Sequence, residues 1–163
     1  MTPPLHQEKG RFLMLHIVLV EPEIPQNTGN IARTAAAIGA RLHIVNPTPF
    51  EISDRTVKRA GLDYWQYLDL EMHDNLDAFL DKYGQESLFF VETGTETLYN
   101  DIQFPENPFL LFGSETVGLP ERLLRSGRGE TITIPVLPHI RSLNVSNAVA
   151  VVAYEVIRQK GSL

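Results

Sequence analysis

Short apolar runs alternate along the chain with segments whose apolar residues recur at helical spacing. Runs rich in β-branched and aromatic residues predict strands at 15–21, 41–46, 64–70, 87–93, 108–114 and 131–136. Helical periodicity and flanking Gly, Ser, Asn or Pro residues predict helices at 27–38, 53–61, 73–84, 119–127 and 144–160. Strands that alternate with helices favour an α/β fold, with a mostly parallel sheet flanked by helices. We expect one such domain over residues 14–163, preceded by a flexible N-terminal extension at 1–13.

The helix predicted at 144–160 is apolar around nearly its whole circumference. Its apolar residues include Val145, Ala148, Val149, Val151, Val152, Ala153 and Val156. Such a pattern indicates burial on more than one side. Because a small domain covers only one side of a terminal helix, a second subunit is the simplest cover for the other. The pattern therefore predicts a homodimer formed through the C-terminal helix.

Composition excludes several classes of protein. The 163 residues contain no cysteine, which excludes disulfide scaffolds, cysteine-rich zinc sites and thiolate nucleophiles. No apolar run reaches the roughly 18 residues of a membrane span, and the N-terminus lacks the apolar core of a signal peptide. These features predict a cytoplasmic protein without a membrane partner.

The net charge of −6 argues at first against a nucleic-acid partner. The charge is unevenly distributed, however. Between residues 51 and 107 there are 13 acidic and 4 basic residues, whereas the rest of the chain holds 7 acidic and 10 basic residues. Uneven charge describes the surface potential, and it leaves both a nucleic-acid partner and a plain solvated acidic face open.

Familiar catalytic motifs are missing. The chain has no G-x-x-x-x-G-K-[ST] phosphate loop and no G-x-G-x-x-G after its first predicted strand. It also has no H-E-x-x-H zinc motif and no G-x-S-x-G nucleophile turn, and its five histidines are scattered. We expect no metal site, and chemistry that depends on Asn, Arg, Ser, Glu and glycine-containing loops.

The first polar motif is "NTGNIARTA", residues 27–35. Asn27, Asn30 and Arg33 recur every three residues, so they are predicted to share one helix face. This face would lie just beyond the carboxyl end of the first strand, where open α/β sheets bind ligands. The alternative is an asparagine cap and an exposed arginine paired with a carboxylate.

Two further motifs follow predicted strands. In "LLFGSETVGLPE", residues 110–121, Gly113 permits close approach of a ligand, and Glu115 is costly after a buried strand unless it has partners. The alternative is a plain turn. In "RSLNVSN", residues 141–147, Arg141 stands beside four Ser and Asn residues in six positions. A helix cap needs one or two such residues, so the surplus indicates another partner.

In this order, the motifs "NTGNIARTA", "LLFGSETVGLP" and "IPVLPHIRSLNVSNAVAVVAYE" resemble the SPOUT superfamily of S-adenosylmethionine-dependent RNA methyltransferases. The compact length, the opening "LHIVLVEPEIPQNTGNIARTAAAIGARLHIVNP" and "RAGLDYW" at 59–65 are most similar to its TrmL family, which methylates the ribose 2′-OH of the tRNA wobble nucleotide. The resemblance implies a deep C-terminal trefoil knot, a homodimer, and S-adenosyl-L-methionine held in the knot. Generic chain topology alone would not have predicted a knot.

The resemblance also assigns site residues. Those implied to bind the methyl donor are Val91, Thr93, Gly113, Ile134, Ser142 and Leu143. Those implied to act in catalysis or to shape the site are Arg33, Asn30, Glu115, Ser142 and Asn144, with Asn27 in support. A guanidinium does not deprotonate near neutral pH, so we interpret Arg33 as a cation that orients the ribose and stabilises the developing alkoxide. The proton acceptor stays open among the other residues.

The implied substrate is the wobble cytidine or modified uridine of the tRNA anticodon loop. Candidate phosphate contacts are Arg33, Arg55, Lys58, Arg59, Arg122, Arg125 and Arg141, each with a solvated surface role as the alternative. Two rival functions remain: 2′-O-methylation of another tRNA or rRNA site, and a non-catalytic, cofactor-dependent RNA-binding factor.

Overall fold

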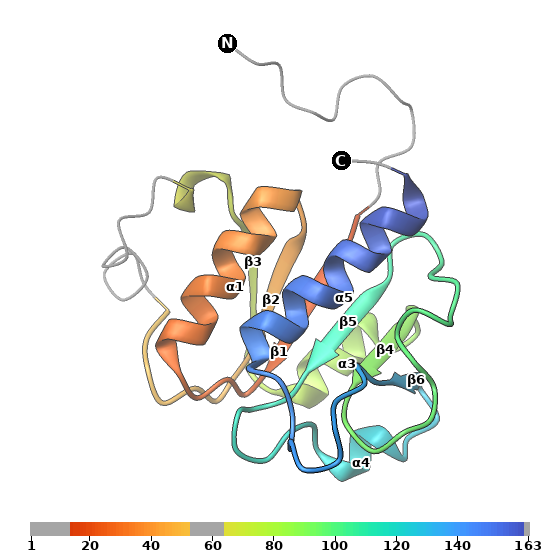
Figure 1. Ribbon diagram of the computed structural model, residues 1–163. Coiled ribbons are helices and arrows are strands. Elements are labelled where there is room, and N and C mark those ends of the chain that lie inside the picture. Colours follow the sequence, from red (N-terminus) through yellow and green to blue (C-terminus); the bar gives the residue numbers. More distant parts are fainter. Residues whose placement is uncertain (1–13, 53–63, 162–163) are drawn as a thin grey trace.

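The computed structural model describes residues 14–52 and 64–161 (Figure 1). The strands are β1 (His16–Val20), β2 (Arg41–Val45), β3 (Asp69–His73), β4 (Leu88–Val91), β5 (Phe109–Phe112) and β6 (Gly129–Ile132). The helices are α1 (Pro25–Ile38), α3 (Leu76–Tyr83), α4 (Glu121–Leu124) and α5 (Val145–Lys160), with a 3-10 turn η1 at Trp65–Tyr67. In this part of the chain, no helix is long and apolar enough to cross a membrane.

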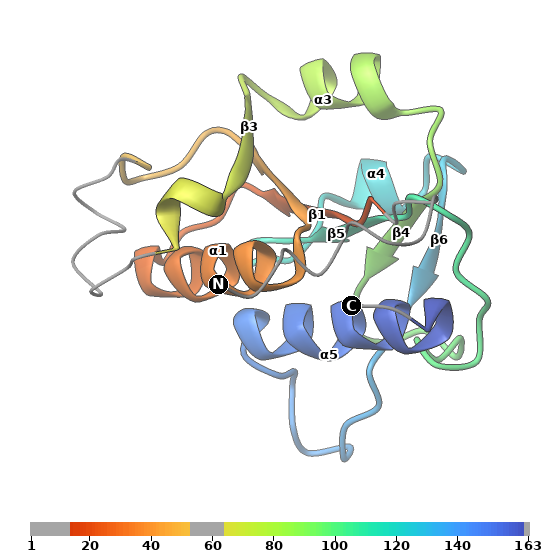
Figure 2. The ribbon, with the colours of Figure 1, turned by 90° about the horizontal axis from the view of Figure 1, so that it is seen from above.

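The six strands form one sheet in the order β3-β2-β1-β5-β4-β6, and every described pair is parallel. Helices α1 and α5 lie on one face of this sheet, and α3 and α4 lie on the other (Figure 2). The chain places β2 and β3 on one side of β1, and β4, β5 and β6 on the other. The order reverses between β1 and β5, and such switch points are where α/β sheets bind ligands.

Two apolar clusters, one on each face, hold the layers together. Ile31 and Ala35 of α1 and Val149, Val152 and Val156 of α5 belong to the larger cluster. The second cluster, under α3 and α4, includes Phe79 and Leu123. The central strands β1 and β5 are buried on both faces, as the continuous apolar runs predicted for a covered parallel sheet, whereas the edge strands β3 and β6 are partly exposed.

The single chain buries only part of α5. Val149, Val152, Ala153, Val156 and Ile157 are buried, whereas Val151 is 36% and Tyr154 is 47% exposed. Helix α5 is therefore apolar on nearly all sides, but this chain buries only one of them. The other side presents apolar side chains to solvent.

Several boundaries differ from the sequence-based prediction. Helix α1 begins at Pro25 with Ile24 as its N-cap, two residues before the predicted start at residue 27. The strand predicted at 64–70 is instead the turn η1 followed by β3, and β6 begins before residue 131. The other described strands and helices lie within the predicted segments. The short helix predicted at 53–61 and the extension at 1–13 lie outside the described residues.

Candidate active site

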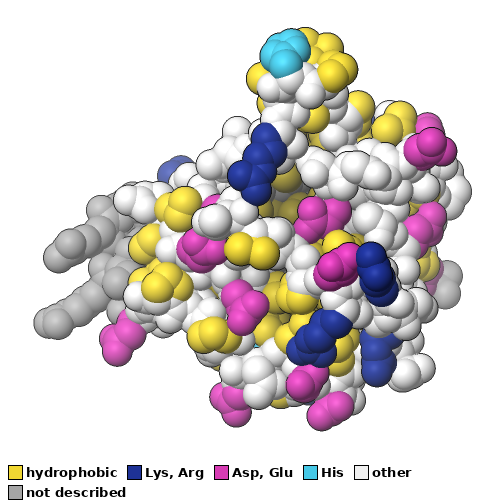
Figure 3. Space-filling view, turned by 90° about the horizontal axis from the view of Figure 1, so that it is seen from below, with side chains coloured by type: hydrophobic (Ala, Val, Ile, Leu, Met, Phe, Trp, Pro, Cys, Tyr) yellow, Lys and Arg dark blue, Asp and Glu magenta, His cyan; other side chains and the backbone are white. Residues whose placement is uncertain are grey.

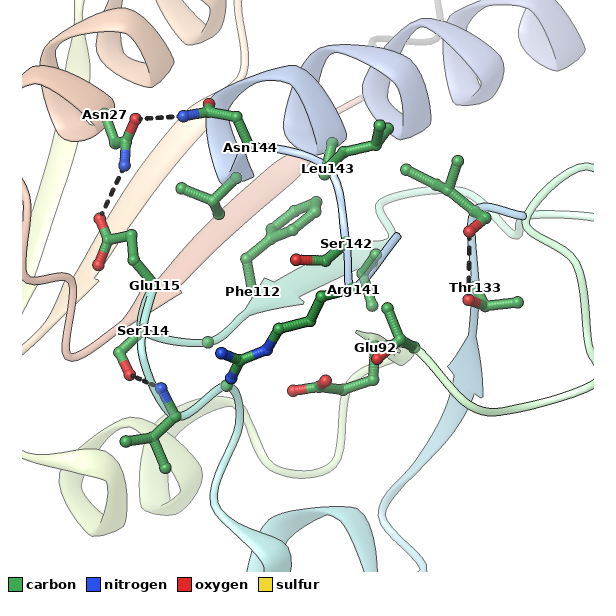
Figure 4. Close-up of a pocket in the computed structure, with 18 of the residues that line it drawn as sticks. Asn27, Glu92, Phe112, Ser114, Glu115, Thr133, Arg141, Ser142, Leu143 and Asn144 are labelled. Carbon is green, nitrogen blue, oxygen red and sulfur yellow. Dashed lines mark hydrogen bonds between the residues drawn. The ribbon is translucent and has the colours of Figure 1, made fainter. Parts of the chain in front are cut away.

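A cavity of about 500 Å³ opens at the carboxyl ends of β4, β5 and β6 and beside the start of α1 (Figure 4). Its lining comes from five segments far apart in the sequence: 24–27, 91–93, 112–118, 133–136 and 141–148. These segments include part of each of the three polar motifs. Seen from this edge, hydrophobic atoms lie in hollows among acidic and basic side chains (Figure 3). The volume is in the range of small-molecule sites.

Glu115 joins the loop after β5 to the start of α1. Its carboxylate accepts hydrogen bonds from the backbone N–H groups of Glu23 and Ile24, at 2.8 and 3.2 Å, and from Asn27 Nδ2 at 3.2 Å. The N-cap residue of α1, Ile24, makes no side-chain hydrogen bond to the first turn of the helix. The carboxylate therefore supplies acceptors beside a helix N-terminus, where negative charge is favourable.

Asn27 and Asn144 continue this connection to the third motif. Asn144 Nδ2 donates to Asn27 Oδ1 at 3.0 Å, and Asn144 Oδ1 accepts from the backbone N–H of Ser146 at 2.9 Å, which caps α5 (Figure 4). One chain of hydrogen bonds thus links the loop after β5, the start of α1 and the start of α5. The alternative interpretation of the third motif as a cap is correct for Asn144 and leaves Ser142 free for another role.

The loop after β5 is a tight turn that depends on two glycines. Gly118 N–H donates to Ser114 O at 2.9 Å, and Gly118 has a φ of +80°. A Cβ on Gly113 would lie 2.0 Å from the carbonyl carbon of Gly118. Any other residue at 113 would force the turn apart, so the glycine is required by the returning backbone itself.

The structure gathers most of the predicted site residues around the cavity. Val91, Thr93, Gly113, Ile134, Ser142, Leu143, Glu115 and Asn144 all line it, together with Asn27. Asn30 and Arg33 do not. They are exposed on α1, whereas Asn27 is 6% exposed. The prediction that Asn27 shares a face with Asn30 and Arg33 was wrong, because a three-residue step falls short of a full turn and rotates Asn27 inward.

Arg33 lies on the open surface of α1 near Tyr64. Tyr64 donates its hydroxyl to Gly29 O at 2.9 Å, and burial raises the pKa of Tyr64 while the charge of Arg33 opposes that shift. Among the described residues, no hydrogen bond or ion pair holds the Arg33 guanidinium. The carboxylate partner expected under the alternative reading of the first motif is therefore not found in this part of the chain.

The other predicted phosphate contacts divide into three groups. Arg122 pairs with Asp77 at 2.9 Å, and Arg125 pairs with Glu121 at 2.6 Å. Arg141 lines the cavity and donates to Thr116 O at 2.8 Å. Arg55, Lys58 and Arg59 lie outside the described residues. Arg33 and Arg141 are therefore the described cations without a carboxylate partner among these candidates.

Sequence reasoning missed Glu92. It follows β4 directly, lines the cavity, and accepts a hydrogen bond from the backbone N–H of Leu119. The signal that singled out Glu115, an acidic residue directly after a buried strand, applied equally to Glu92.

A second polar cluster lies away from this cavity. His16, His43 and His73 are buried and joined by hydrogen bonds, with His16 Nδ1 2.8 Å from His43 Nε2 and His43 Nδ1 3.0 Å from His73 Nε2. Burial lowers the pKa of His43 to about 3 and of His16 to about 4. We refer to these three side chains as the histidine chain.

The histidine chain adjoins Glu71. Nitrogen and oxygen atoms of His43, Glu71 and His73 come within 4.8 Å of one another, a spacing that a metal ion can use. The two histidines already bond each other, however, and Glu71 is held by Tyr83 at 2.6 Å and by Lys82. Both ring nitrogens of His43 and both carboxylate oxygens of Glu71 are therefore already paired within the protein.

Known proteins are similar to this chain in sequence and in fold. The model of the SpoU rRNA methylase family matches residues 14–154. The tRNA (cytidine(34)-2′-O)-methyltransferase of Aeromonas hydrophila is 46% identical over 149 residues, which cover 91% of this chain and 96% of that protein. A solved structure described as "Structural insights into the 2-OH methylation of C/U34 on tRNA" is 46% identical and has a TM-score of 0.85. The match covers 95% of this chain and 95% of that one.

A more distant structure is that of the SpoU methyltransferase AviRb from Streptomyces viridochromogenes in complex with the cofactor AdoMet. It is 25% identical with a TM-score of 0.79, and the match covers 99% of this chain and 63% of that one. The family match spans all five segments that line the cavity. With three polar motifs meeting at the switch point of a parallel sheet, and with relatives this similar over nearly its whole length, the chain belongs to the SpoU rRNA methylase family.

Proposed function

We propose that this protein transfers a methyl group from S-adenosyl-L-methionine to the ribose 2′-OH of the wobble nucleotide of tRNA, a cytidine or modified uridine at position 34. The observation that carries the proposal is the cavity that joins the three motifs in a chain 46% identical to a relative named for this reaction. The match covers nearly all of both proteins, so no additional RNA-binding domain of that relative is left unmatched.

The cavity suits the methyl donor. Val91, Phe112 and Ile134 offer an apolar slot for an adenine ring, and exposed polar groups of Glu92, Ser142 and Arg141 offer contacts for the ribose and the amino-acid part. Its volume of about 500 Å³ accommodates a ligand of this size. The donor supplies a methyl group that its sulfonium charge already activates.

In the reaction, the 2′-oxygen bonds to the methyl carbon while the carbon–sulfur bond breaks. The sulfonium becomes a neutral thioether, and the hydroxyl proton must pass to an acceptor. Alignment of the two reactants and stabilisation of the developing alkoxide should therefore account for most of the rate. Arg33 has a guanidinium free of protein partners in the described structure, as this role requires.

Glu115 and Asn144 act mainly by positioning. Both Glu115 oxygens already hold the N-terminal end of α1, and Asn144 caps α5 while it holds Asn27. The two carboxylate oxygens of Glu115 are already occupied by three donors. Ser142, which has no such commitment, is the better candidate for contact with the donor or the substrate.

The C-terminal segment is proposed to form the trefoil knot that the family resemblance implies. Support comes from its contacts with two separate loops. Thr133 pairs with the loop after β4 through the backbone of Thr97 and Tyr99, both at 2.9 Å, and Gln159 of α5 binds Phe104 of the same loop at 2.9 Å. Between these points the chain passes the loop after β5, where Arg141 binds Thr116.

We further propose a homodimer through α5, with Arg33 of one protomer completing the cavity of the other. The exposed Val151 and Tyr154 on α5 support an apolar interface, and the position of Arg33 outside its own cavity supports a shared site. Mixing Arg33→Ala chains with Ser142→Ala chains tests this arrangement. Each mixed dimer should have one intact site of two. An equimolar mixture, in which about half of the dimers are mixed, should therefore regain about a quarter of wild-type activity. No recovery would contradict a shared site.

Transfer of labelled methyl groups tests the function directly. The protein is incubated with methyl-labelled S-adenosylmethionine and with bulk tRNA or rRNA in separate reactions, and the labelled nucleotide is mapped. Label on the 2′-oxygen of tRNA nucleotide 34 is the expected result. Label on another tRNA site or in rRNA would contradict the wobble assignment, and donor binding without any labelled RNA would contradict the enzymatic role.

A further inference from the structure

Glu92 is an acidic side chain in the wall of the cavity. Its backbone is fixed at the end of β4, because Glu92 N–H donates to Ile132 O of the neighbouring strand at 3.0 Å. Its side chain turns toward the cavity, on the same side as Ser142 and Arg141 (Figure 4). A charge placed directly after a buried strand is unfavourable unless it is well paired.

Within residues 14–52 and 64–161, one oxygen of this carboxylate has a partner and the other has none. Oε1 accepts from the backbone N–H of Leu119 at 2.5 Å. For Oε2, the described residues provide no hydrogen bond and no ion pair. Arg141, the nearest cationic side chain in the cavity wall in Figure 4, donates instead to Thr116 O. A glutamine oxygen would bind Leu119 equally well, so loop anchoring leaves the charge of Glu92 unexplained.

The turn after β5 is built around this carboxylate. A Cβ on Gly118 would lie 2.7 Å from Glu92 Oε1, and the φ of +80° at Gly118 independently favours glycine. The side chain is therefore held in one place by the turn, with Oε2 presented as a fixed acceptor. A pre-positioned acceptor loses little conformational freedom when a ligand binds.

We propose that Glu92 Oε2 accepts a hydrogen bond from the ribose of the methyl donor. This inference rests on the proposed function. Val91, next to Glu92 in the chain, contributes to the apolar slot proposed for adenine, and the group bonded directly to adenine is the ribose. A carboxylate that accepts from a ribose hydroxyl is an established mode of nucleoside recognition in other α/β folds. Glu92 thereby becomes a binding residue for the donor, in addition to Val91 and Thr93.

Calorimetric binding of S-adenosylhomocysteine tests the contact without any turnover. Glu92→Gln keeps an oxygen for the Leu119 N–H but removes the charge, and it should weaken binding about tenfold, since charge-assisted hydrogen bonds are the stronger class. The matched control is Glu96→Gln, which removes the same charge from the same loop at an exposed position outside the cavity lining. Equal affinity of wild type and Glu92→Gln would overturn the inference.

Three ligand analogues identify the group that Glu92 meets. 5′-Methylthioadenosine retains the ribose but lacks the amino-acid part, so the effect of Glu92→Gln should persist. The effect should vanish for its 2′-deoxy or its 3′-deoxy analogue. Loss of the effect with 5′-methylthioadenosine would place Glu92 against the ammonium group and overturn the ribose contact.

Wild-type protein alone provides a second measurement, in case Glu92→Gln fails to fold. One of the deoxy analogues should bind it about tenfold more weakly than 5′-methylthioadenosine, and equal binding of all three would overturn the inference. If wild type binds none of the nucleosides, including S-adenosylhomocysteine, the proposed function itself fails. That outcome is distinct from wild-type binding without a contribution from Glu92.

Discussion

The cavity and the histidine chain are both polar clusters beside the same sheet, yet they are built in opposite ways. In the histidine chain each ring bonds its neighbour, and His43 is completely buried. In the cavity, Glu92, Ser142 and Arg141 retain polar atoms that face open space. Arg141 and Ser142 are exposed and Glu92 is half-buried, so their polar atoms can exchange water for a ligand at little cost. Closed clusters contribute to the fold, and open ones indicate function.

Substitutions at the proposed site should therefore lower activity, whereas substitutions in the histidine chain should lower stability. The largest expected effect is that of Arg33→Ala, which removes the unpaired cation. We expect methyl transfer to fall about 10²–10³-fold, as for the loss of one group that stabilises transition-state charge. Thermal unfolding and binding of S-adenosylhomocysteine should be unchanged. The matched control is Arg125→Ala, an exposed arginine paired with Glu121, and a similar loss there would argue for general charge effects.

The converse test is His43→Ala. This change leaves a cavity in the core and removes the partner of both His16 and His73. We expect the free energy of unfolding to fall by about 3 kcal/mol in denaturant titrations, with donor affinity retained in the folded fraction. His139→Ala, on the exposed loop before α5, is the control and should have little effect. Loss of donor binding in folded His43→Ala protein would mean that the two clusters are coupled.

Acidification should also lower the stability of the protein, through the histidine chain. Burial lowers the pKa of His16 to about 4 and of His43 to about 3, below the 6.5 of an exposed histidine. The unfolded chain then binds more protons than the folded one below pH 6.5, so stability is lost as the pH falls from 6.5 toward 4. At about 1.4 kcal/mol per pKa unit, each of the two groups contributes up to about 3 kcal/mol, so we expect a loss of about 3–6 kcal/mol over this window, measured by denaturant titration at several pH values.

Glu71 does not account for that loss. Burial opposes its ionisation, but hydrogen bonds from Lys82 and Tyr83 lower the pKa of Glu71 to about 2, so it stays charged throughout the window. Replacing the exposed His139 by glutamine should leave the pH profile unchanged. A flat profile between pH 6.5 and 4 in the wild type would contradict the buried, neutral state of the histidine chain.

The smallest expected effect is that of Asn27→Ala, at the junction of the three motifs. It removes one hydrogen bond to Glu115 and one from Asn144. We expect a loss of stability of about 1–2 kcal/mol and a decrease in methyl transfer greater than in donor affinity, because the start of α1 loses its alignment. Asn147→Ala, exposed on α5, is the control. An unchanged rate of methyl transfer would show that this junction only supports the fold.

Much of the fold was predictable because its signals are local. Apolar runs such as 15–21 and 108–114 mark strands buried on both faces, and Gly39 and Gly161 mark helix ends through their left-handed conformation. The alternation of strands and helices then predicts a parallel sheet. For the site, the three motifs identified three of the five segments that line the cavity, and the resemblance added Val91, Thr93 and Ile134 in the other two.

What the sequence determined by itself is thus which segments are strands and helices, and which loops carry surplus polar residues. The tertiary structure decided which of those polar residues are paired. It directed Glu115 to the N-terminal end of α1, rotated Asn27 inward, left Arg33 outside the cavity and gave Glu92 an open carboxylate oxygen. These outcomes depend on contacts between segments as much as 117 residues apart. Local patterns cannot encode them, because whether a polar atom has a partner depends on which distant segment packs against it.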